Sequence, residues 1–549
     1  MTYHIYWGDT HHNTYQHYNQ DPPLDTVLDF ASTHLDFYTG AYYTQVFLEV
    51  PPKESVRQGA AIKMEGGHPV EILSAGNQIW TGVRFEGPKD LTKLAEEWAE
   101  FQDVTRAWNR PDEFIAFAGY EWQGNSRWGD FNVTYREEGP PVYMVDTLPE
   151  LYGYLRKLRK SGNDAIAIPH HTAYSVGQRA PTWSTCDESL SPYAEVYSIH
   201  GCSETDEELI GLRSNPHMGP GVGGGTYVEA LDLGLHMGAI CSTDNWSNMP
   251  GHWGQGIMAC LATELTRDGL WEAFRARRVY GVTGDRIQLN FTCNGEPMGS
   301  ILPHTSERNI EVSVVGCDAI DRIELLRNNR VIATHCHQGT WDLPQPGQTS
   351  RYKVRIEPGW GPHPGELPLP EQVWQGALSV NGGRLIDWEP CWVTRGQGVP
   401  QLRDNEAQFA MVSHQSYVTK PSQGATVFTF EASPDDEVLV QMKNLHLRQS
   451  AIDMATRSHL LWSEADSAAY LAAMTDGDPV RAAASDVYYH MAGKVKVHRA
   501  IPEAGYTAKL TLTDDEPMDG EVQYRVRVEQ RNGQRAWSSP IWVKSVEFI

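Results

Sequence analysis

Residues 3–15 read YHIYWGDTHHNTY, and this stretch places an acid, two histidines and an amide directly behind a short apolar run. The run at 3–7 is aromatic and β-branched, which is typical of a β-strand. The polar residues that follow would lie at the end of that strand, where α/β proteins build their sites. A solvated turn with an incidental histidine pair is the alternative interpretation, so the rest of the chain has to decide.

Residues 1–288 alternate between helix-like and strand-like segments. Apolar residues recur at close to helical spacing over 91–108 and again over 148–158. The strand-like segments are FIAFAGYEW (114–122), AIAIPHH (165–171), YAEVYSIHG (193–201) and MGAICSTDN (237–245). Alternation of this kind predicts an α/β domain with parallel strands joined by crossover helices.

Residues 289–549 show short alternating runs broken by turns, which indicates antiparallel strands. Hairpin turns are predicted at 328–329 and at 532–533, each between two runs of alternating residues. Such a pattern is typical of a β-sandwich. A Pro, Gly and Trp-rich segment at about 340–400 is predicted to be an ordered insertion, and a helical insert is predicted at 463–474.

Composition excludes several classes of function. The chain has 549 residues, which exceeds one ordinary core and predicts two or three domains. Its 70 acidic and 45 basic residues give a net charge of −25, which argues against nucleic acid or an anionic membrane as a partner. No apolar run long enough to span a membrane occurs, and the N-terminal residues lack a signal-peptide pattern. We expect a cytoplasmic protein with a small-molecule partner, either monomeric or a homo-oligomer.

The eight cysteines are scattered, and no two of them form a CxxC pair. This spacing excludes a zinc ribbon or a thioredoxin-type motif, and it suits a reducing compartment in which thiols act as small core residues. Histidine, with 21 copies, is the more informative source of metal ligands.

Each inferred strand of the first half ends in side chains that can bind a metal. They are Asp9, His11 and Asn13 after the first strand, then Glu121, then His170 and His171, then Glu195 and His200, and finally Asp244. Parallel strands bring their carboxyl ends together on one face. Imidazole nitrogens and carboxylate oxygens around an open water position are what a hydrolytic metal requires, so the pattern predicts a metal site there.

Each of these residues also has a plainer interpretation. Asp9 and Asp244 could cap turns, and His200 could lie at the surface. Of the adjacent His170 and His171, alternation along a strand would point one into the site and the other away. Taken together, the five strand ends favour a metal site over five independent coincidences.

Several motifs resemble the PHP (polymerase and histidinol phosphatase) superfamily, and within it the bacterial family of unknown function DUF3604. They are GDTHHNT, AGYEW, IPHHTAY, EVYSIHG, STDNW, RARRVYGVTGDRI, NGEPMG and the terminal AWSSPIWV. For the superfamily, this resemblance implies a distorted (β/α)7 barrel with one to three divalent metals at the carboxyl ends of its strands, hydrolysing phosphate esters. For the narrower family it implies no settled activity.

The sequence departs from the superfamily pattern at several ligand positions. Asn13 replaces a histidine, Ala41 and Tyr42 stand where an Asp-His element is usual, Asp130 replaces a histidine, and Trp246 ends the last motif. Amide oxygen is a poorer ligand than imidazole, and indole is none. The remaining ligand set holds one or two ions of Mn, Zn or Fe, and comprises His11, Asn13, Glu121, Asp130, one of His170 and His171 (with His170 assigned as the ligand), His200 and Asp244.

The leading hypothesis is a metal-dependent hydrolase of a small substrate, with a phosphoester as the favoured bond, that uses a metal-activated water. His12 or His171 could act as general acid, because imidazole titrates in the required range. Arg179, Arg278 and Arg286 are candidate phosphate anchors, although a structural role is favoured for the last two.

Two other functions stay open. Five tryptophans lie near the site segments, and aromatic walls of this kind would suit cleavage of a glycosidic, ester or C–O bond in a sugar or aryl substrate. They are Trp122, Trp128, Trp183, Trp246 and Trp253. Alternatively, the loss of ligands could leave a degenerate barrel that only binds.

Overall fold

The computed structural model describes the chain from residue 2 to residue 545 with gaps. The described residues are 2–14, 22–43, 46–49, 62–65, 68–72, 83–86, 91–124, 128–174, 179–207, 224–245, 249–359, 372–413, 424–463, 465, 468, 472, 477–478 and 494–545. Between residues 44 and 90 only the backbone of the named strands is described.

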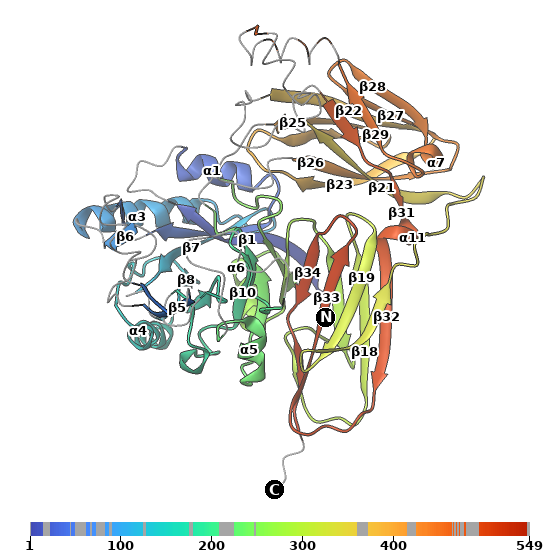
Figure 1. Cartoon of the computed structure of the whole chain (residues 1–549). Coiled ribbons are helices and arrows are strands. Elements are labelled where there is room, and N and C mark those ends of the chain that lie inside the picture. Colours follow the sequence, from blue (N-terminus) through green and yellow to red (C-terminus); the bar gives the residue numbers. More distant parts are fainter. Residues whose placement is uncertain are drawn as a thin grey trace.

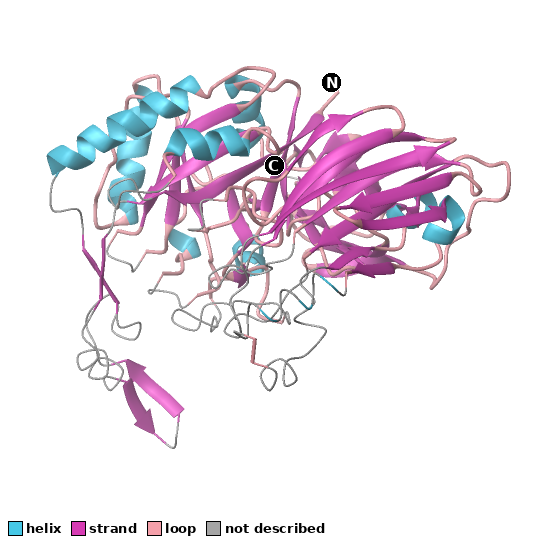
Figure 2. Ribbon diagram, turned by 90° about the horizontal axis from the view of Figure 1, so that it is seen from above, coloured by secondary structure: helices cyan, strands magenta, loops and turns pink. Residues whose placement is uncertain are grey.

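The N-terminal part of the chain, up to β14, mixes helices and strands (Figure 1). Its strands are β1 (His4–Thr14), β2 (Phe37–Tyr43), β3 (Val46–Glu49), β4 (Ile62–Glu65), β5 (His68–Ile72), β6 (Val83–Glu86), β7 (Ile115–Trp122), β8 (Phe131–Tyr135), β9 (Ala165–Pro169), β10 (Tyr193–Ser198), β11 (Gly201–Cys202), β12 (Gly238–Cys241), β13 (Ile257–Ala262) and β14 (Val279–Val282). Its helices are α1 (Leu24–Ala31), α3 (Leu91–Ala107), α4 (Leu148–Lys160), α5 (Tyr227–Asp232) and α6 (Arg267–Arg275). Figure 2 shows that helices gather on this side of the molecule, while the remainder is built almost entirely from strands.

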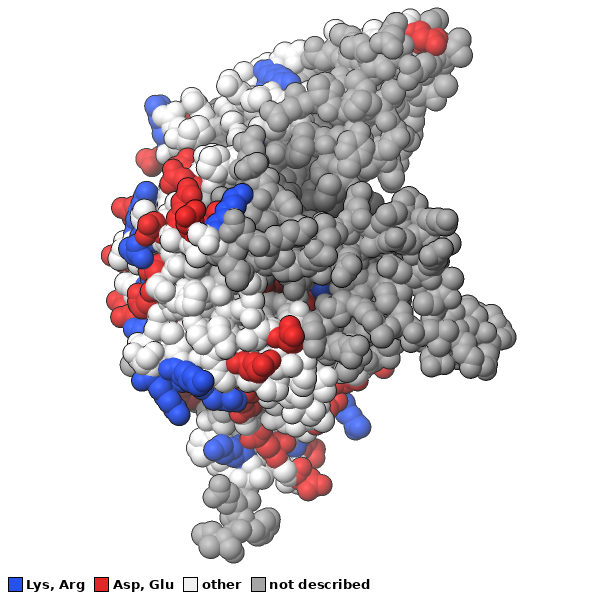
Figure 3. All heavy atoms as spheres, turned by 90° about the vertical axis from the view of Figure 1, so that its left-hand side faces the viewer, with Lys and Arg blue, Asp and Glu red and all other residues white. Residues whose placement is uncertain are grey.

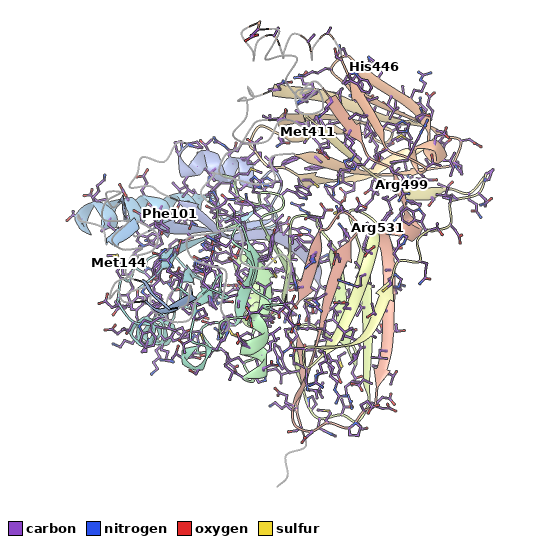
Figure 4. All side chains as sticks on the ribbon, viewed as in Figure 1. Phe101, Met144, Met411, His446, Arg499 and Arg531 are labelled. Carbon is purple, nitrogen blue, oxygen red and sulfur yellow. The ribbon has the colours of Figure 1, made fainter. Side chains whose placement is uncertain are left out.

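The helices and strands predicted for this part are confirmed. Helix α3 matches the predicted segment 91–108, and its Trp98 and Phe101 rings stack with centroids 5.2 Å apart (Phe101 is labelled in Figure 4). Helix α4 begins at a capping box formed by Thr147 and Glu150, and Gly162 follows its end with a φ of +98°.

The strand directions differ in part from the expected all-parallel arrangement. Strands β1, β2 and β7 are parallel neighbours, and so are β10 and β12. Strand β8 is antiparallel to both β7 and β9, because the short connection after β7 leaves no room for a crossover helix. Strands β7 and β9 therefore still run in the same direction.

The N-terminal part is a mixed α/β unit, but its hydrogen-bonded strands do not close on themselves. The sheet runs in the order β13-β1-β2-β7-β8-β9, and β11-β10-β12 form a separate small sheet. Within the described residues the strands form open sheets, so the predicted (β/α)7 barrel is not observed. The carboxyl ends of β1, β7, β9, β10 and β12 nevertheless converge on one cluster of histidines and carboxylates.

The first β-sandwich follows directly after β14. Its strands are β15 (Gln288–Cys293), β16 (Glu296–Pro297), β17 (Ile301–Leu302), β18 (Arg308–Val315), β19 (Ile320–Arg327), β20 (Arg330–Cys336), β32 (Thr507–Asp514), β33 (Val522–Gln530), β34 (Arg535–Ser538) and β35 (Ile541–Val543). Both predicted hairpins are confirmed: Asn328 and Asn329 turn with positive φ between β19 and β20, and β33 pairs with β34. Strand β34 also pairs with β14, so one sheet runs across the predicted boundary at residue 288.

A second β-sandwich lies between β20 and β32 in the sequence. Its strands are β21 (Ser350–Pro358), β22 (Gln372–Asn381), β23 (Arg384–Cys391), β24 (Gly398–Leu402), β25 (Glu406–Ser413), β26 (Ala425–Ala432), β27 (Glu437–Met442), β28 (Leu445–Ser450), β29 (His459–Trp462), β30 (Lys494–Val497) and β31 (Ile501–Pro502), with short helices α7 (Ala451–Met454) and α11 (Glu503–Tyr506). It includes most of the predicted insertion at 340–400, and the predicted helical insert at 463–474 falls largely outside the described residues. Figure 4 labels Met411 within this sandwich, and Arg499 and Arg531 where it meets the first.

Asp285 connects all three parts. Both of its oxygens accept from Arg355 Nη2 of the second sandwich, at 2.8 and 2.6 Å. Asn532, from the turn after β33, and Gln530, the last residue of β33, donate to Oδ2 at 2.7 and 2.8 Å. Trp253 Nε1 donates to Oδ1 at 2.7 Å. Asp285 belongs to the motif RRVYGVTGDRI, whose role here is to hold the parts together.

The AWSSPIW segment performs the same function on the other side of β14. Ser539 Oγ donates to the carbonyl of Val279 at 2.5 Å and accepts from the Ala239 amide at 3.1 Å. Trp537 Nε1 donates to the fully buried Glu204 at 2.6 Å. These contacts bind the first sandwich to β12 and to the loop after β11, close behind the strand ends that carry the histidines and carboxylates.

The cysteines and the surface charges can be described together. All eight cysteines lie in described segments and are free thiols. On the face seen in Figure 3, Lys and Arg side chains are interspersed with Asp and Glu. None of the described helices combines the length and hydrophobicity needed to cross a lipid bilayer.

Candidate metal centre

The polar residues 9–14 of the sequence YHIYWGDTHHNTY lie within strand β1 itself and do not follow it. The pairing of β1 with β2 shifts register between Asp9 and His12, which places a bulge inside the GDTHH sequence. The carboxylate of Asp9 accepts hydrogen bonds from the amides of His11, Thr243 and Gly251 and from the Thr243 hydroxyl, at 2.6–3.1 Å. These bonds give Asp9 a structural role rather than that of a ligand. Asp9 therefore fixes the end of β1 against the loop that follows β12.

His11 lies at the centre of the site and is fully buried. Its Nδ1 lies 3.0 Å from Glu195 Oε2, which also accepts from Ser242 Oγ at 2.6 Å. This contact orients Nε2 toward Asp244 Oδ1 at 3.2 Å and Glu121 Oε2 at 3.8 Å. Burial opposes a charge on the imidazole, but Asp244 and Glu195 raise the pKa of His11 well above its ordinary value.

Asp244 lies between two imidazoles. Its Oδ1 faces His11 and accepts from Asn13 Nδ2 at 3.1 Å, while its Oδ2 lies 3.0 Å from His200 Nε2. The residue has a φ of +48°, a left-handed conformation that Asp adopts more readily than most residues, and its amide donates to the His11 carbonyl at 2.7 Å. His200 is held from its other side by the Tyr174 hydroxyl, 2.9 Å from Nδ1.

His170 and His171 both enter the site, although alternation along a strand would admit only one. Strand β9 ends at Pro169, and His171 has a φ of +35°, which turns the backbone so that the two rings lie at 79° to each other with centroids 4.3 Å apart. The His170 ring also lies 4.2 Å from His11, and the His171 ring lies 5.0 Å from His200. Four imidazoles thus form one contiguous row.

Asp130 lies beside the middle of this row, next to His170 and His171. Its Oδ2 lies 3.3 Å from His171 Nε2 and 2.6 Å from Arg179 Nη2. Burial raises the pKa of Asp130 to about 7, against the opposing effects of Arg179 and His170. Arg179 is buried, with a φ of +72°, and its Nη1 donates to Gln123 Oε1 at 3.2 Å.

Glu121 completes the carboxylates of the site. Its Oε1 accepts from Gln123 Nε2 at 2.5 Å and lies 3.8 Å from His170 Nε2. Burial would raise the pKa of Glu121, but His11 and His170 lower it below its ordinary value. Gln123 therefore links Glu121 to Arg179.

Three overlapping triads in this site have the spacing of metal ligands. They are His11–His170–Asp244, Asp130–His170–His171 and His171–His200–Asp244, and within each triad the candidate ligand atoms lie within 4.8 Å of one another. The six residues of these triads, together with Glu121, form a single group that we call the cluster.

The residues of the cluster fit a divalent ion. Both ring nitrogens of His170 and Oδ1 of Asp130 are buried and have no hydrogen-bond partner among the described residues. Such orphaned polar atoms are costly unless a cation satisfies them. Imidazole nitrogen mixed with carboxylate oxygen is a donor set that Mn, Fe and Zn all accept.

Other candidate residues lie outside the triads. His12 Nδ1 contacts the Tyr38 hydroxyl at 2.9 Å, and burial followed by the charge of His11 lowers the pKa of His12 to about 3. Asn13 donates from Nδ2 to Asp244, while its Oδ1 is buried and has no hydrogen-bond partner among the described residues, so its role as a ligand stays a prediction. Arg278 donates to Glu272 and to the Leu261 carbonyl.

Arg286 is likewise engaged outside the cluster. It donates to the His34 carbonyl, and its guanidinium lies 5.8 Å from the centre of the Trp7 ring. These contacts agree with the structural role favoured for Arg278 and Arg286.

The predicted aromatic wall is not formed by the tryptophans in the described part of the chain. Trp122 and Trp183 are buried in core clusters and donate to the carbonyls of Val145 and Thr226. Trp253 donates to Asp285 at the junction, Trp128 packs at the edge of a core cluster, and Trp246 lies outside the described residues.

Sequence reasoning misses the residues that hold the ligands in place. The sequence identifies Glu195 as a strand-end acid, but its role through His11 follows only from the structure. Tyr174, Gln123, Ser242 and Thr243 each contact a cluster residue, Glu195 or Asp9, and no pattern of spacing singles them out. The polar character of IPHHTAY and AICSTDN is the one signal available.

One segment of the chain matches the model of a family of unknown function. Residues 68–209 match the family model described as "Protein of unknown function (DUF3604)". An uncharacterized protein of Chlamydia pneumoniae is 26% identical over 277 residues, which cover 47% of this chain and 43% of the relative. An uncharacterized protein of Chlamydia trachomatis serovar D is 25% identical over 269 residues, covering 45% and 41% respectively. The chain thus spans about two-fifths of the length of these curated relatives.

A solved structure is also similar in part. It is a two-domain protein from Bacteroides vulgatus that contains a predicted PHP-like metal-dependent phosphoesterase, and it matches with a TM-score of 0.27 and 13% identity over 59% of this chain and 79% of that chain.

Replacing Glu195 by Gln is expected to weaken Mn²⁺ binding about 10–100-fold, since carboxylates that hold a metal-binding imidazole contribute this much. The amide keeps the shape of the side chain but cannot support the basicity of the His11 ring. Isothermal titration calorimetry with Mn²⁺ measures the change. Glu296→Gln, at an exposed position of β16, is the matched control. Equal affinities for the two variants would show that Glu195 does not act through His11.

Proposed function

We propose that the protein is a metal-dependent hydrolase that binds one or two Mn, Zn or Fe ions in the cluster and cleaves phosphate esters of small molecules. One observation carries the proposal: four imidazoles and two carboxylates, largely buried at the ends of separate strands, form overlapping triads with metal-ligand spacing, and Glu121 lies beside them. The motifs that resemble the PHP superfamily support a phosphoester as the bond cleaved.

His11, His170 and Asp244 would hold one ion, and His171 and His200 with Asp244 would hold a second. Asp130 and Glu121 balance the positive charge. When bound, a divalent ion polarises the phosphoryl oxygens and makes an attacking water more acidic. The open sheets of the N-terminal part would be the scaffold, in place of the closed (β/α)7 barrel implied by the resemblance.

Among the described residues, Arg179 would anchor the phosphate. Its guanidinium lies beside Asp130 at the edge of the cluster, and a planar fork of donors matches phosphate oxygens. For His171, burial and then the neighbouring His170 and His200 lower the pKa well below the ordinary value. A neutral His171 suits a ligand better than the general acid that the sequence suggests, and the same reasoning disfavours His12 as an acid.

Hydrolysis of p-nitrophenyl phosphate and a panel of phosphorylated small molecules tests the proposal. Protein stripped with a chelator and reloaded with Mn²⁺, Zn²⁺ or Fe²⁺ is expected to release phosphate, and Arg179→Lys is expected to raise KM because a bidentate contact is lost. Metal binding without hydrolysis of any phosphate or other ester would favour a binding protein. Absence of bound metal would contradict the hydrolase and favour the binding protein.

A further inference from the structure

Two of the three triads share Asp244 but differ in their exposure to solvent. We call them the inner triad and the outer triad, and they are, respectively, His11–His170–Asp244 and His171–His200–Asp244. The side chains of His11 and His170 are fully buried, whereas that of His200 is 15% exposed. An ion in the outer triad would therefore exchange with solvent more readily than an ion in the inner triad.

A carboxylate supports the inner triad. Glu195 Oε2 lies 3.0 Å from His11 Nδ1 and accepts from Ser242 Oγ at 2.6 Å. An ionised carboxylate only accepts hydrogen bonds, so it keeps a proton on Nδ1 and makes Nε2 the nitrogen that binds an ion. This Nε2 lies 3.2 Å from Asp244 Oδ1 and 3.8 Å from Glu121 Oε2, so a fourth donor is close by. The inner triad is thus arranged for an ion in advance.

A phenol supports the outer triad, and a phenol can either donate or accept. If the Tyr174 hydroxyl donates to His200 Nδ1 over their 2.9 Å separation, the proton of the neutral ring lies on Nε2, which is 3.0 Å from Asp244 Oδ2. A protonated Nε2 does not bind an ion. Binding requires the other tautomer, in which Nδ1–H donates to the phenol oxygen. Tyr174 therefore supports the binding tautomer of His200 without imposing it.

The second imidazole of each triad leads to the same ranking. Both ring nitrogens of His170 are buried and have no hydrogen-bond partner among the described residues, so an ion in the inner triad displaces no hydrogen bond from this ring. His171 Nε2 lies 3.3 Å from Asp130 Oδ2, and the same oxygen lies 2.6 Å from Arg179 Nη2. The carboxylate beside the outer triad is therefore already shared with a guanidinium, and it offers less negative charge to an ion.

We propose that the cluster binds two divalent ions unequally, a tightly held ion in the inner triad and an exchangeable ion in the outer triad, with Tyr174 as the positioning residue of the outer triad alone. The inference rests on the proposed metal-dependent function, because it concerns the same ions. Occupancy of the outer triad, and with it the two-ion form of the protein, would then follow the concentration of free metal.

Titration of the chelator-stripped 549-residue chain with Mn²⁺ tests the inference. Calorimetry of wild type should resolve two equivalents whose affinities differ by about tenfold or more, and elemental analysis should find only the tighter one after gel filtration. Tyr174→Phe should weaken the second equivalent about 10–100-fold and leave the first unchanged, since it removes the partner of one metal-binding imidazole. Glu195→Gln should weaken the first equivalent.

Tyr152→Phe is the matched control for Tyr174→Phe. The Tyr152 hydroxyl is also buried, 2.9 Å from Ser191 Oγ, and neither residue belongs to the cluster. This variant should bind both ions as wild type does, which excludes the loss of a buried hydroxyl as the cause. His200→Ala, which removes a ligand of the outer triad itself, should keep one tight equivalent.

Four results would overturn the inference while leaving the proposed function in place. They are two equal affinities in wild type, a single equivalent in wild type, equal effects of Tyr174→Phe on both ions or on neither, and loss of both ions in His200→Ala. A wild-type protein that takes up no metal would instead overturn the proposed function, and this inference with it.

Discussion

Protein carrying Asp244→Asn is expected to bind Mn²⁺ at least about 100-fold more weakly than wild type, beyond the range seen when only supporting residues are changed. Asp244 contributes to two of the three triads, and one oxygen faces His11 while the other faces His200. Asparagine tolerates the left-handed backbone at this position, so the variant removes charge without straining the chain. Elemental analysis after gel filtration, together with calorimetry, measures the loss.

Asp112→Asn is the matched control for Asp244→Asn. Asp112 also has a positive φ, of 65°, but its side chain is exposed and lies outside the triads. The control should keep wild-type metal content. If both variants kept it, the cluster would not be the metal site, and the hydrolase proposal would lose its basis.

Replacing Asp285 by Asn is expected to lower the free energy of unfolding by about 3–5 kcal/mol, the usual effect of leaving one member of a buried ion pair without its partner. Arg355 is 6% exposed, and it would lose the charge that faces it across the junction. Urea denaturation followed by tryptophan fluorescence measures the change. Asp321→Asn, which removes an exposed ion pair with Arg531, should change stability by about 1 kcal/mol or less.

The double variant Asp285→Asn/Arg355→Met sharpens this test. Removing both charges leaves no unpaired ion, so the double variant should be more stable than Asp285→Asn alone. A double variant that is less stable than the single one would show that Arg355 stabilises the junction through other contacts, such as its guanidinium lying 5.4 Å from the centre of the Trp253 ring.

The same carboxylate makes stability depend on pH. Burial would raise the pKa of Asp285, but Arg355 and the hydrogen bonds from Asn532 and Trp253 lower it below its ordinary value. The stabilisation is therefore fully present above the unfolded pKa of about 3.9 and is lost as the pH falls through the lower folded pKa. Unfolding monitored between about pH 5 and about pH 2 should show a weaker acid dependence for Asp285→Asn than for wild type.

Much of the N-terminal part can be predicted because its signals are local. The capping residues of α4 and the apolar runs of β7 and β9 each specify one element, and the strand ends then identify the polar cluster. The entry of both His170 and His171 cannot be predicted, because it depends on one backbone angle at His171. The antiparallel direction of β8 could not be predicted from the sequence, because it is set by the short connection between β7 and β8 and not by a pattern of residues.

The second sandwich shows a different limit of sequence reasoning. Strands β21 to β30 alternate just as β15 to β20 do, and alternation does not say which strands pair with which. The choice is made by contacts across long stretches of chain, such as Tyr352 stacked on Phe430 in the core of the second sandwich. The clearest example of such a long-range choice is in the first sandwich. There β18 pairs with β32, although the entire second sandwich lies between these two strands in the sequence.

The pairing of β34 with β14 has a consequence for synthesis on the ribosome. The last cluster residue, Asp244, is made about 300 residues before β35 (Ile541–Val543), and a chain growing at about 5–20 residues per second needs roughly 15–60 s to cover that stretch. Until then β14 has an open edge, and the contacts of the AWSSPIW segment with Glu204 and Ala239 have not yet formed. The cluster therefore gains its support from the first sandwich only after the C-terminal strands have been made, and for that interval β14 presents an unpaired sheet edge.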